Sequence, residues 1–141
     1  DGARSGIRIY GEQRGCAVAD FDEDGRSDLV VTQNSGSTQL YRNRQGRVGF
    51  RVRVEGPPGN GTGIGTKLRL IDESGARSGP VREIHAGSGY WSQDDAVQVM
   101  VGLRHSVQLW VQWPTGVEEK FALPEAVREI VIGPGTKPQI R

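Results

Sequence analysis

The chain of 141 residues has little of what several protein classes require. Cys16 is its only cysteine, so no disulfide can form within it. No apolar run approaches the roughly 18 residues of a membrane-spanning helix. A formal net charge of +1, with acids and bases interspersed, gives no electrostatic argument for a nucleic-acid partner.

Two further absences concern the start of the chain and its periodicity. The first residues contain no apolar segment of a secretory signal, and Asp1 stands where an initiator Met is expected. We therefore expect a processed or excised part of a longer protein. Few segments have helical periodicity, whereas glycine is abundant at 21 residues and short alternating runs separate the turns. These patterns predict an all-β chain.

The most informative stretch is the acidic segment at residues 20–28, which alternates carboxylates and then turns. Its carboxylates belong to Asp20, Asp22, Asp24 and Asp28. Acids held this close repel one another unless a cation sits among them, and calcium prefers such oxygen ligands. Gly25 permits the sharp turn, and the carbonyl of Arg26 can complete the shell. The alternative is a solvated acidic turn that binds nothing.

The segments beside this acidic stretch decide which kind of calcium loop it is. An EF-hand needs a helix on each side and a Glu at its twelfth position, where this chain has Val31. Residues 16–19 and 29–32 are short, apolar and rich in β-branched side chains, so they indicate strands. The segment resembles the FG-GAP/VCBS repeat, the calcium-loop blade of integrin-type β-propellers, and this resemblance implies Ca²⁺ bound in a propeller-type blade.

A second resemblance covers the rest of the chain. Its separated blocks are residues 63–68, 82–84, 87–95, 102–103 and 111–116. In this order they resemble the ASPIC/UnbV domain, which follows FG-GAP repeats in cartilage acidic protein and in UnbV proteins of enediyne gene clusters. The resemblance implies a blade at residues 1–46, a small antiparallel β-sandwich or open barrel at 47–133, and a tail at 134–141. We expect the tail to be frayed.

Within this division the residue patterns predict some local details. Residues 7–10 alternate as a strand does, and residues 11–15 have the composition of a turn. Cys16 lies in an apolar run and is expected to be a small core residue. Arg51 and Arg53 alternate with apolar residues, which predicts that both face water. Trp113 shares the apolar face of its strand, so Trp110 faces the opposite side. There it is either exposed or packed under the blade, and we expect it to fill the interface between the domains.

The polar segment at residues 87–95 is the second candidate site. Its side chains are those of Tyr90, Trp91, Ser92, Gln93 and Asp94. The aromatic pair could stack on a sugar or peptide while the amide and carboxylate hydrogen-bond to it. The alternative is structural, with the aromatic rings filling the sandwich and the polar groups capping the backbone.

Enzymatic interpretations have less to support them. A triad of Ser92, His85 and Asp94 is conceivable, but no Gly-x-Ser-x-Gly elbow accompanies it. Two histidines do not make a zinc site, and the glycine-rich residues 59–65 lack the spacing of a phosphate loop. We expect a calcium-binding, non-enzymatic, extracytoplasmic module whose protein or carbohydrate ligand is unknown. The alternatives are an enzyme, a biosynthetic accessory protein related to UnbV, or a carbohydrate-binding module.

Overall fold

The structure, a computed structural model, describes residues 2–87, 96–101 and 106–141. Apart from the one-turn helix α1 (Gly2–Ser5), its regular elements are all strands, which confirms the predicted all-β class. The strands are β1 (Glu12–Ala19), β2 (Asp28–Asn34), β3 (Gly36–Tyr41), β4 (Phe50–Val54), β5 (Lys67–Asp72), β6 (Arg77–Glu83), β7 (Gln98–Met100), β8 (Ser106–Gln112), β9 (Glu118–Ala122), β10 (Glu129–Ile132) and β11 (Gln139–Ile140). No helix in the described part of the chain is long and apolar enough to cross a membrane.

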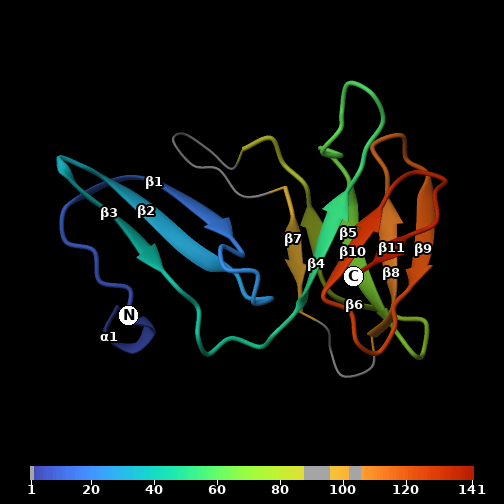
Figure 1. Cartoon of the computed structure of the whole chain (residues 1–141), viewed down its shortest axis with the longest axis horizontal. Helices are drawn as coiled ribbons and strands as arrows, with labels where there is room; N and C mark the ends of the chain where they lie inside the picture. Colours follow the sequence, from blue (N-terminus) through green and yellow to red (C-terminus); the bar gives the residue numbers. More distant parts are fainter. Residues whose placement is uncertain (1, 88–95, 102–105) are drawn as a thin grey trace.

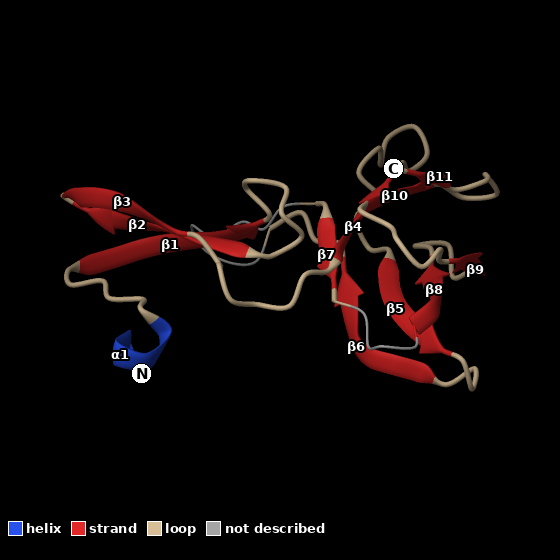
Figure 2. Cartoon of the chain, turned by 60° about the horizontal axis from the view of Figure 1, so that its bottom comes forward, coloured by secondary structure: helices blue, strands red, loops and turns tan. Residues whose placement is uncertain are grey.

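The first three strands form a separate antiparallel sheet in the order β1-β2-β3. It lies as a flat blade beside the rest of the molecule (Figures 1 and 2). The acidic segment joins β1 to β2, and the register pairs Ala19 with Asp28 where the two strands meet it. A turn at Ser35 joins β2 to β3, and the φ of 54° at this residue is in the left-handed region.

Several local predictions for this first region are wrong. Residues 7–10 form no strand, and β1 already begins at Glu12, inside the segment predicted to be a turn. Cys16 is exposed, because among the described strands no second sheet packs against the β1–β3 sheet at its side chain. Alternation of residue types shows which face a side chain takes, but it does not show whether anything covers that face.

The remaining strands form a sandwich of two four-stranded sheets, β11-β10-β4-β7 and β6-β5-β8-β9. Alternate side chains from both sheets meet in one core. The buried core comprises Phe50, Val52, Val54, Leu68, Leu70, Ile84, Met100, Leu109, Val111, Trp113, Phe121, Ile130 and Ile132. The sandwich confirms the expected architecture, although β4 and β10 run parallel and make their sheet mixed. The hydrophobic pattern carries no information on strand direction.

Two expectations about the sandwich are wrong. The tail is not frayed at its end, because β11 pairs with β10 and places Ile140 opposite Ile130. Trp113 is buried in the core as predicted, but Trp110 does not lie at a domain interface. It is only 4% exposed because Arg77 stacks 4.4 Å above its ring, and its Nε1 donates to Glu118 at 2.8 Å. A cation over an aromatic face can thus cover the outer surface of a sheet.

Candidate metal centre

The β1–β2 hairpin brings together three of the carboxylates predicted to bind metal. Asp20 directly follows β1, Asp28 begins β2, and Asp22 lies in the connecting loop. One oxygen from each of these residues lies within 4.8 Å of the other two. Asp20 and Asp28 are buried, at 7% and 3% exposure, so their charges are poorly screened by water.

Backbone amides hold the two buried carboxylates in place. Asp20 accepts hydrogen bonds from the amides of Asp24 at 3.0 Å and Gly25 at 3.1 Å. Asp28 accepts one from the amide of Phe21 at 3.1 Å and another from that of Asn43 at 2.7 Å. These bonds close the loop upon itself and fix the direction of both carboxylates. Each oxygen retains a second lone pair for a further ligand.

Asp22 differs from its two neighbours because its oxygens have no hydrogen-bond donor. Both are buried and accept no hydrogen bond from the described residues. The guanidinium of Arg42 contacts Oδ2 as an ion pair, without the geometry of a hydrogen bond. Buried acceptors without donors are costly, and a metal ion bound at this position would remove that cost.

The structure places Asp24, a further predicted ligand, differently. The carboxylate of Asp24 lies outside the trio, where it accepts bonds from the amide of Arg26 at 3.0 Å and from its Nη1 at 2.9 Å. Arg26 also donates from Nε to the carbonyl of Gly46 at 2.7 Å, so its side chain lies against the segment between β3 and β4. A rotation of Asp24 about its side-chain bonds would be needed for it to join the other three carboxylates.

The three carboxylates form a donor set that could hold a hard divalent cation. Calcium takes oxygen ligands at about 2.3–2.6 Å, so ligands on opposite sides of the ion are about 5 Å apart. The mutual separation of the three oxygens, within 4.8 Å, agrees with that span. Two unit charges 4 Å apart repel by about 1 kcal/mol in water and about 4 kcal/mol near a protein surface. A central cation converts this repulsion into attraction.

The acidic loop also contacts the chain at the start of the sandwich. The amide of Gly49, just before β4, donates to the carbonyl of Gly25 at 2.8 Å. Gly25 has a φ of +81°, and a Cβ there would lie 2.6 Å from the Gly49 carbonyl oxygen. Only glycine meets both the backbone conformation and this close approach.

An ion-pair chain strengthens the same contact. Arg51 in β4 binds Glu23 of the loop at 2.7 Å and lies 3.3 Å from Glu129 of β10. The hydrogen bond from Arg51, together with its charge, lowers the pKa of Glu23. Burial by itself would lower the pKa of Arg51, but Glu23 and Glu129 outweigh it and raise that pKa. Glu23 takes a φ of 58°, which is uncommon for a side chain other than glycine.

Sequence reasoning missed Arg51 and Arg42 as parts of this site. Arg51 is only 8% exposed, which contradicts its predicted water-facing position, because the acidic loop covers that face of β4. Arg42 belongs to the segment after β3, outside residues 20–28, and its side chain contacts Asp22 of the loop. The sequence indicates them only by an excess of arginine close to an acidic segment. That excess does not predict which arginine pairs with which acidic residue.

The second predicted site lies outside the described residues. Tyr90, Trp91, Ser92, Gln93 and Asp94 all belong to residues 88–95. The described member of the conceivable triad, His85, is exposed, and its Nδ1 is 4.0 Å from Glu83. Ligand recognition and hydrolysis by this segment therefore remain predictions.

The protein is all-β, and the loop between β1 and β2 carries a group of carboxylates that could hold a metal ion. The sequence model of the family described as ASPIC and UnbV matches residues 56–139, which is more than half of the chain. The chain therefore belongs to the ASPIC and UnbV family. No curated protein sequence matches it significantly. The acidic loop precedes the matched segment, and Arg51 links Glu23 of the loop to Glu129 within that segment.

Proposed function

We propose that residues 20–28 bind a calcium ion and that this ion stabilises the loop and its contact with the sandwich. The proposed ligands are Asp20, Asp22, Asp24, the carbonyl of Arg26, and Asp28. The observation that carries the proposal is the approach of the Asp20, Asp22 and Asp28 oxygens to within 4.8 Å of one another. The buried oxygens of Asp22, which accept no hydrogen bond from the described residues, support it independently.

In this proposal the ion has a structural role and not a catalytic one. Four carboxylates and a carbonyl would occupy most of the coordination sphere, and an ion surrounded in this way has few open positions to polarise a substrate. The loop instead contacts β4 and β10 through Glu23, Gly25 and Arg51. An ion that fixes the loop would therefore also fix the contact between the N-terminal sheet and the sandwich.

The remaining parts of the proposal concern context. A loop of alternating acids between two strands is the pattern of an FG-GAP/VCBS blade, and a lone blade cannot bury both of its faces. We therefore propose a non-enzymatic, extracytoplasmic module that forms the C-terminal part of a longer FG-GAP protein. Extracellular calcium modules bind with dissociation constants near 10⁻⁴–10⁻³ M, which suits a compartment with about 1 mM calcium.

The test is calcium titration by calorimetry, with thermal melting in calcium and in chelator. With a dissociation constant of about 0.1 mM and about 1 mM calcium, linkage adds about 1.4 kcal/mol to the free energy of unfolding. That corresponds to a rise in Tm of about 3–6 °C for a chain of this size. Asp22→Asn should abolish the heat of binding and the rise in Tm.

Glu12→Gln serves as the matched control for this test. It removes one acidic charge from the same sheet, at a β1 residue that pairs with Arg14 far from the loop in sequence. This variant should respond to calcium as the wild type does. If the wild type melts at one temperature in both calcium and chelator, the metal assignment is wrong.

A further inference from the structure

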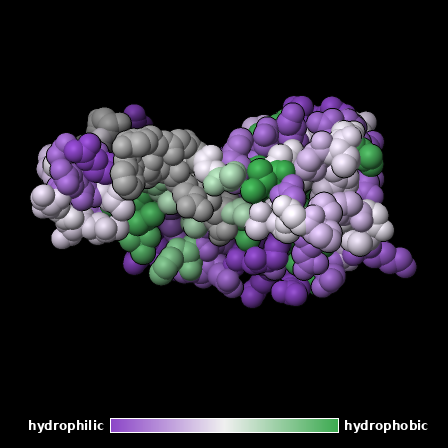
Figure 3. All heavy atoms as spheres, turned by 90° about the horizontal axis from the view of Figure 1, so that it is seen from above, coloured by the Kyte–Doolittle hydropathy of each residue, from purple (hydrophilic) through white to green (hydrophobic). Residues whose placement is uncertain are grey.

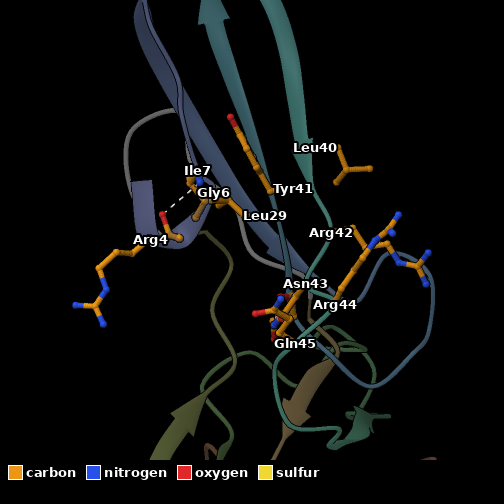
Figure 4. Close-up of a pocket in the computed structure, with 12 residues that line it drawn as sticks. Arg4, Gly6, Ile7, Leu29, Leu40, Tyr41, Arg42, Asn43, Arg44 and Gln45 are labelled. Atoms are coloured by element: carbon orange, nitrogen blue, oxygen red, sulfur yellow. Dashed lines mark hydrogen bonds between the residues drawn. The ribbon is translucent and has the colours of Figure 1, made fainter. Parts of the chain in front are cut away.

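A hollow in the described surface lies at the end of β3, outside the cluster of Asp20, Asp22 and Asp28. Its volume is about 770 Å³. It is lined by Arg4, Ser5, Gly6, Ile7, Ser27, Leu29, Leu40, Tyr41, Arg42, Asn43, Arg44 and Gln45. These residues come from the N-terminal segment, from the start of β2, and from β3 and the chain just after it. Figure 4 shows how they are arranged around the end of β3.

The hollow lies beside the edge of β3. In the described structure β3 pairs only with β2, so its outer backbone groups have no strand partner. Tyr41 pairs with Leu29 and so shares its face of the sheet, whereas Leu40 takes the opposite face. The lining therefore comes from both faces around one edge. An extended segment that pairs with β3 would fit this lining, because its side chains would alternate between the two faces of the sheet.

The charge of the hollow points to an acidic occupant. Three arginines line it, and none of its lining residues is acidic. Arg42 and Arg44 extend from one side of the β3 end, and Arg4 lies on the other (Figure 4). Leu40 adds apolar surface, with 50% of its area exposed. Two copies of this edge would bring arginine against arginine, which disfavours self-pairing.

Arg42 connects this hollow to the acidic loop. Its guanidinium contacts Asp22 and lies 3.8 Å from Asp24, yet the same residue lines the hollow. A divalent cation held by Asp22 would compete with Arg42 for the same oxygens and would repel the guanidinium. At 4 Å that repulsion is about 2 kcal/mol in water for a doubly charged ion and more near a protein surface.

We propose that the β3 edge docks an extended segment of a partner protein, with acidic and apolar residues in alternation, and that calcium strengthens this docking. The inference rests on the proposed calcium site. The segment pairs its backbone with β3, its acidic residues meet Arg42 and Arg44, and its apolar residues meet the Leu29 and Tyr41 face. Calcium takes over Asp22 and leaves the Arg42 guanidinium available to the partner.

The probe is a short fluorescein-labelled peptide of alternating Glu and Val, measured by fluorescence anisotropy with the whole chain. A peptide with Lys in place of Glu is the control ligand. We expect calcium at about 1 mM to raise the affinity for the acidic peptide roughly fivefold, the effect of one additional exposed ion pair. Arg44→Gln should lower the affinity by a similar factor and leave calcium binding unchanged. Arg47→Gln removes the same charge outside the hollow lining and should change nothing.

Arg42→Gln separates the proposed route from a direct calcium bridge to the peptide. If Arg42 transmits the effect, this variant binds the peptide weakly and equally with and without calcium, while calorimetry still detects calcium. If calcium bridges to the peptide, the dependence persists in the variant and the proposal is overturned. Equal binding of the Lys and Glu peptides would also overturn it.

The remaining outcomes distinguish this inference from the calcium proposal. Absence of peptide binding in a chain that binds calcium means that the arginines only protect the strand edge against pairing. That result overturns the inference and leaves the proposed function intact. Absence of calcium binding overturns the proposed function and the calcium dependence together. If the chain self-associates and Leu40→Glu abolishes that association, the β3 edge binds a second copy of the chain. This result would overturn the proposal of an acidic partner segment.

Discussion

The N-terminal sheet and the sandwich are stabilised in different ways. In the described structure Val31 is the only hydrophobic side chain of β1–β3 that is buried, whereas the sandwich encloses a continuous core. Val18, Phe21 and Leu40 are exposed in the N-terminal region. Figure 3 shows hydrophobic surface there among hydrophilic groups. Because a fully buried Val or Leu side chain contributes about 1.5–3 kcal/mol, the sheet lacks the main source of stability that the sandwich has.

The difference shows where the stability of a small sheet can come from. Three polar contacts of the described residues join the acidic loop to the chain that follows the sheet: Gly25 with Gly49, Arg26 with Gly46, and Glu23 with Arg51. All three contacts originate in the acidic loop. We therefore expect the order of the loop to influence whether the sheet and the sandwich unfold as one unit.

The chain offers separate probes for its two regions. All three tryptophans, Trp91, Trp110 and Trp113, belong to the C-terminal region. Cys16, the only cysteine, is exposed in β1 and can carry a fluorophore. Urea unfolding followed by tryptophan emission reports on the sandwich, and the label on Cys16 reports on the sheet.

The largest expected effect is a cavity in the sandwich core. Leu109→Ala empties a fully buried position and should lower the free energy of unfolding by about 2–5 kcal/mol, seen in tryptophan emission. Leu40→Ala, at a half-exposed leucine of the sheet, should change it by less than about 0.5 kcal/mol. Similar losses from the two changes would contradict the contrast between the regions.

The next effect concerns the close approach at Gly25. Gly25→Ala combines a left-handed φ with a clash against the carbonyl of Gly49, and it should cost about 2–3 kcal/mol and weaken calcium binding. Gly75→Ala is a matched control, because Gly75 has the same φ of +81° with open space around it. It should cost only about 1 kcal/mol. Equal costs would show that the contact with Gly49 adds nothing to stability.

Arg51→Gln should separate the two regions. It removes the charge that faces Glu129 in a largely buried position, at a cost of about 2 kcal/mol. The Cys16 label should then report unfolding at a lower urea concentration than the tryptophans. Arg53→Gln removes the same charge at a more exposed residue, which pairs only with Glu129 among the described ion pairs, and it should leave the two transitions together. Coincident transitions in both variants would count against the role of the loop as a connector.

The smallest expected effect is the regional response to calcium. If the proposed site binds calcium, the ion should stabilise the transition of the Cys16 label by about 1.4 kcal/mol at about 1 mM and a dissociation constant of about 0.1 mM. The tryptophan transition should follow it in the wild type and become insensitive in Arg51→Gln. A calcium response in tryptophan emission alone would place the ion elsewhere.

The sequence predicted those parts of the acidic site that lie within one short segment, residues 20–28. The spacing of Asp20, Asp22 and Asp28 around Gly25 predicts their convergence, because a hairpin loop fixes where neighbouring residues lie. Asp24 shows the limit of this reasoning, since its carboxylate lies with Arg26 and Arg42 in the structure. Which of several acids an arginine binds depends on where distant backbone brings that arginine.

The sequence by itself determined the all-β class, the acidic hairpin and the faces of most sandwich strands, because these features depend on the properties of adjacent residues. Only the tertiary structure decided that Arg51 is buried, that β4 and β10 run parallel, and that β11 pairs with β10. Each of these outcomes depends on which distant segment covers a face or an edge. Alternation of residue types leaves that choice open, because it specifies the two faces of a strand without specifying its neighbours.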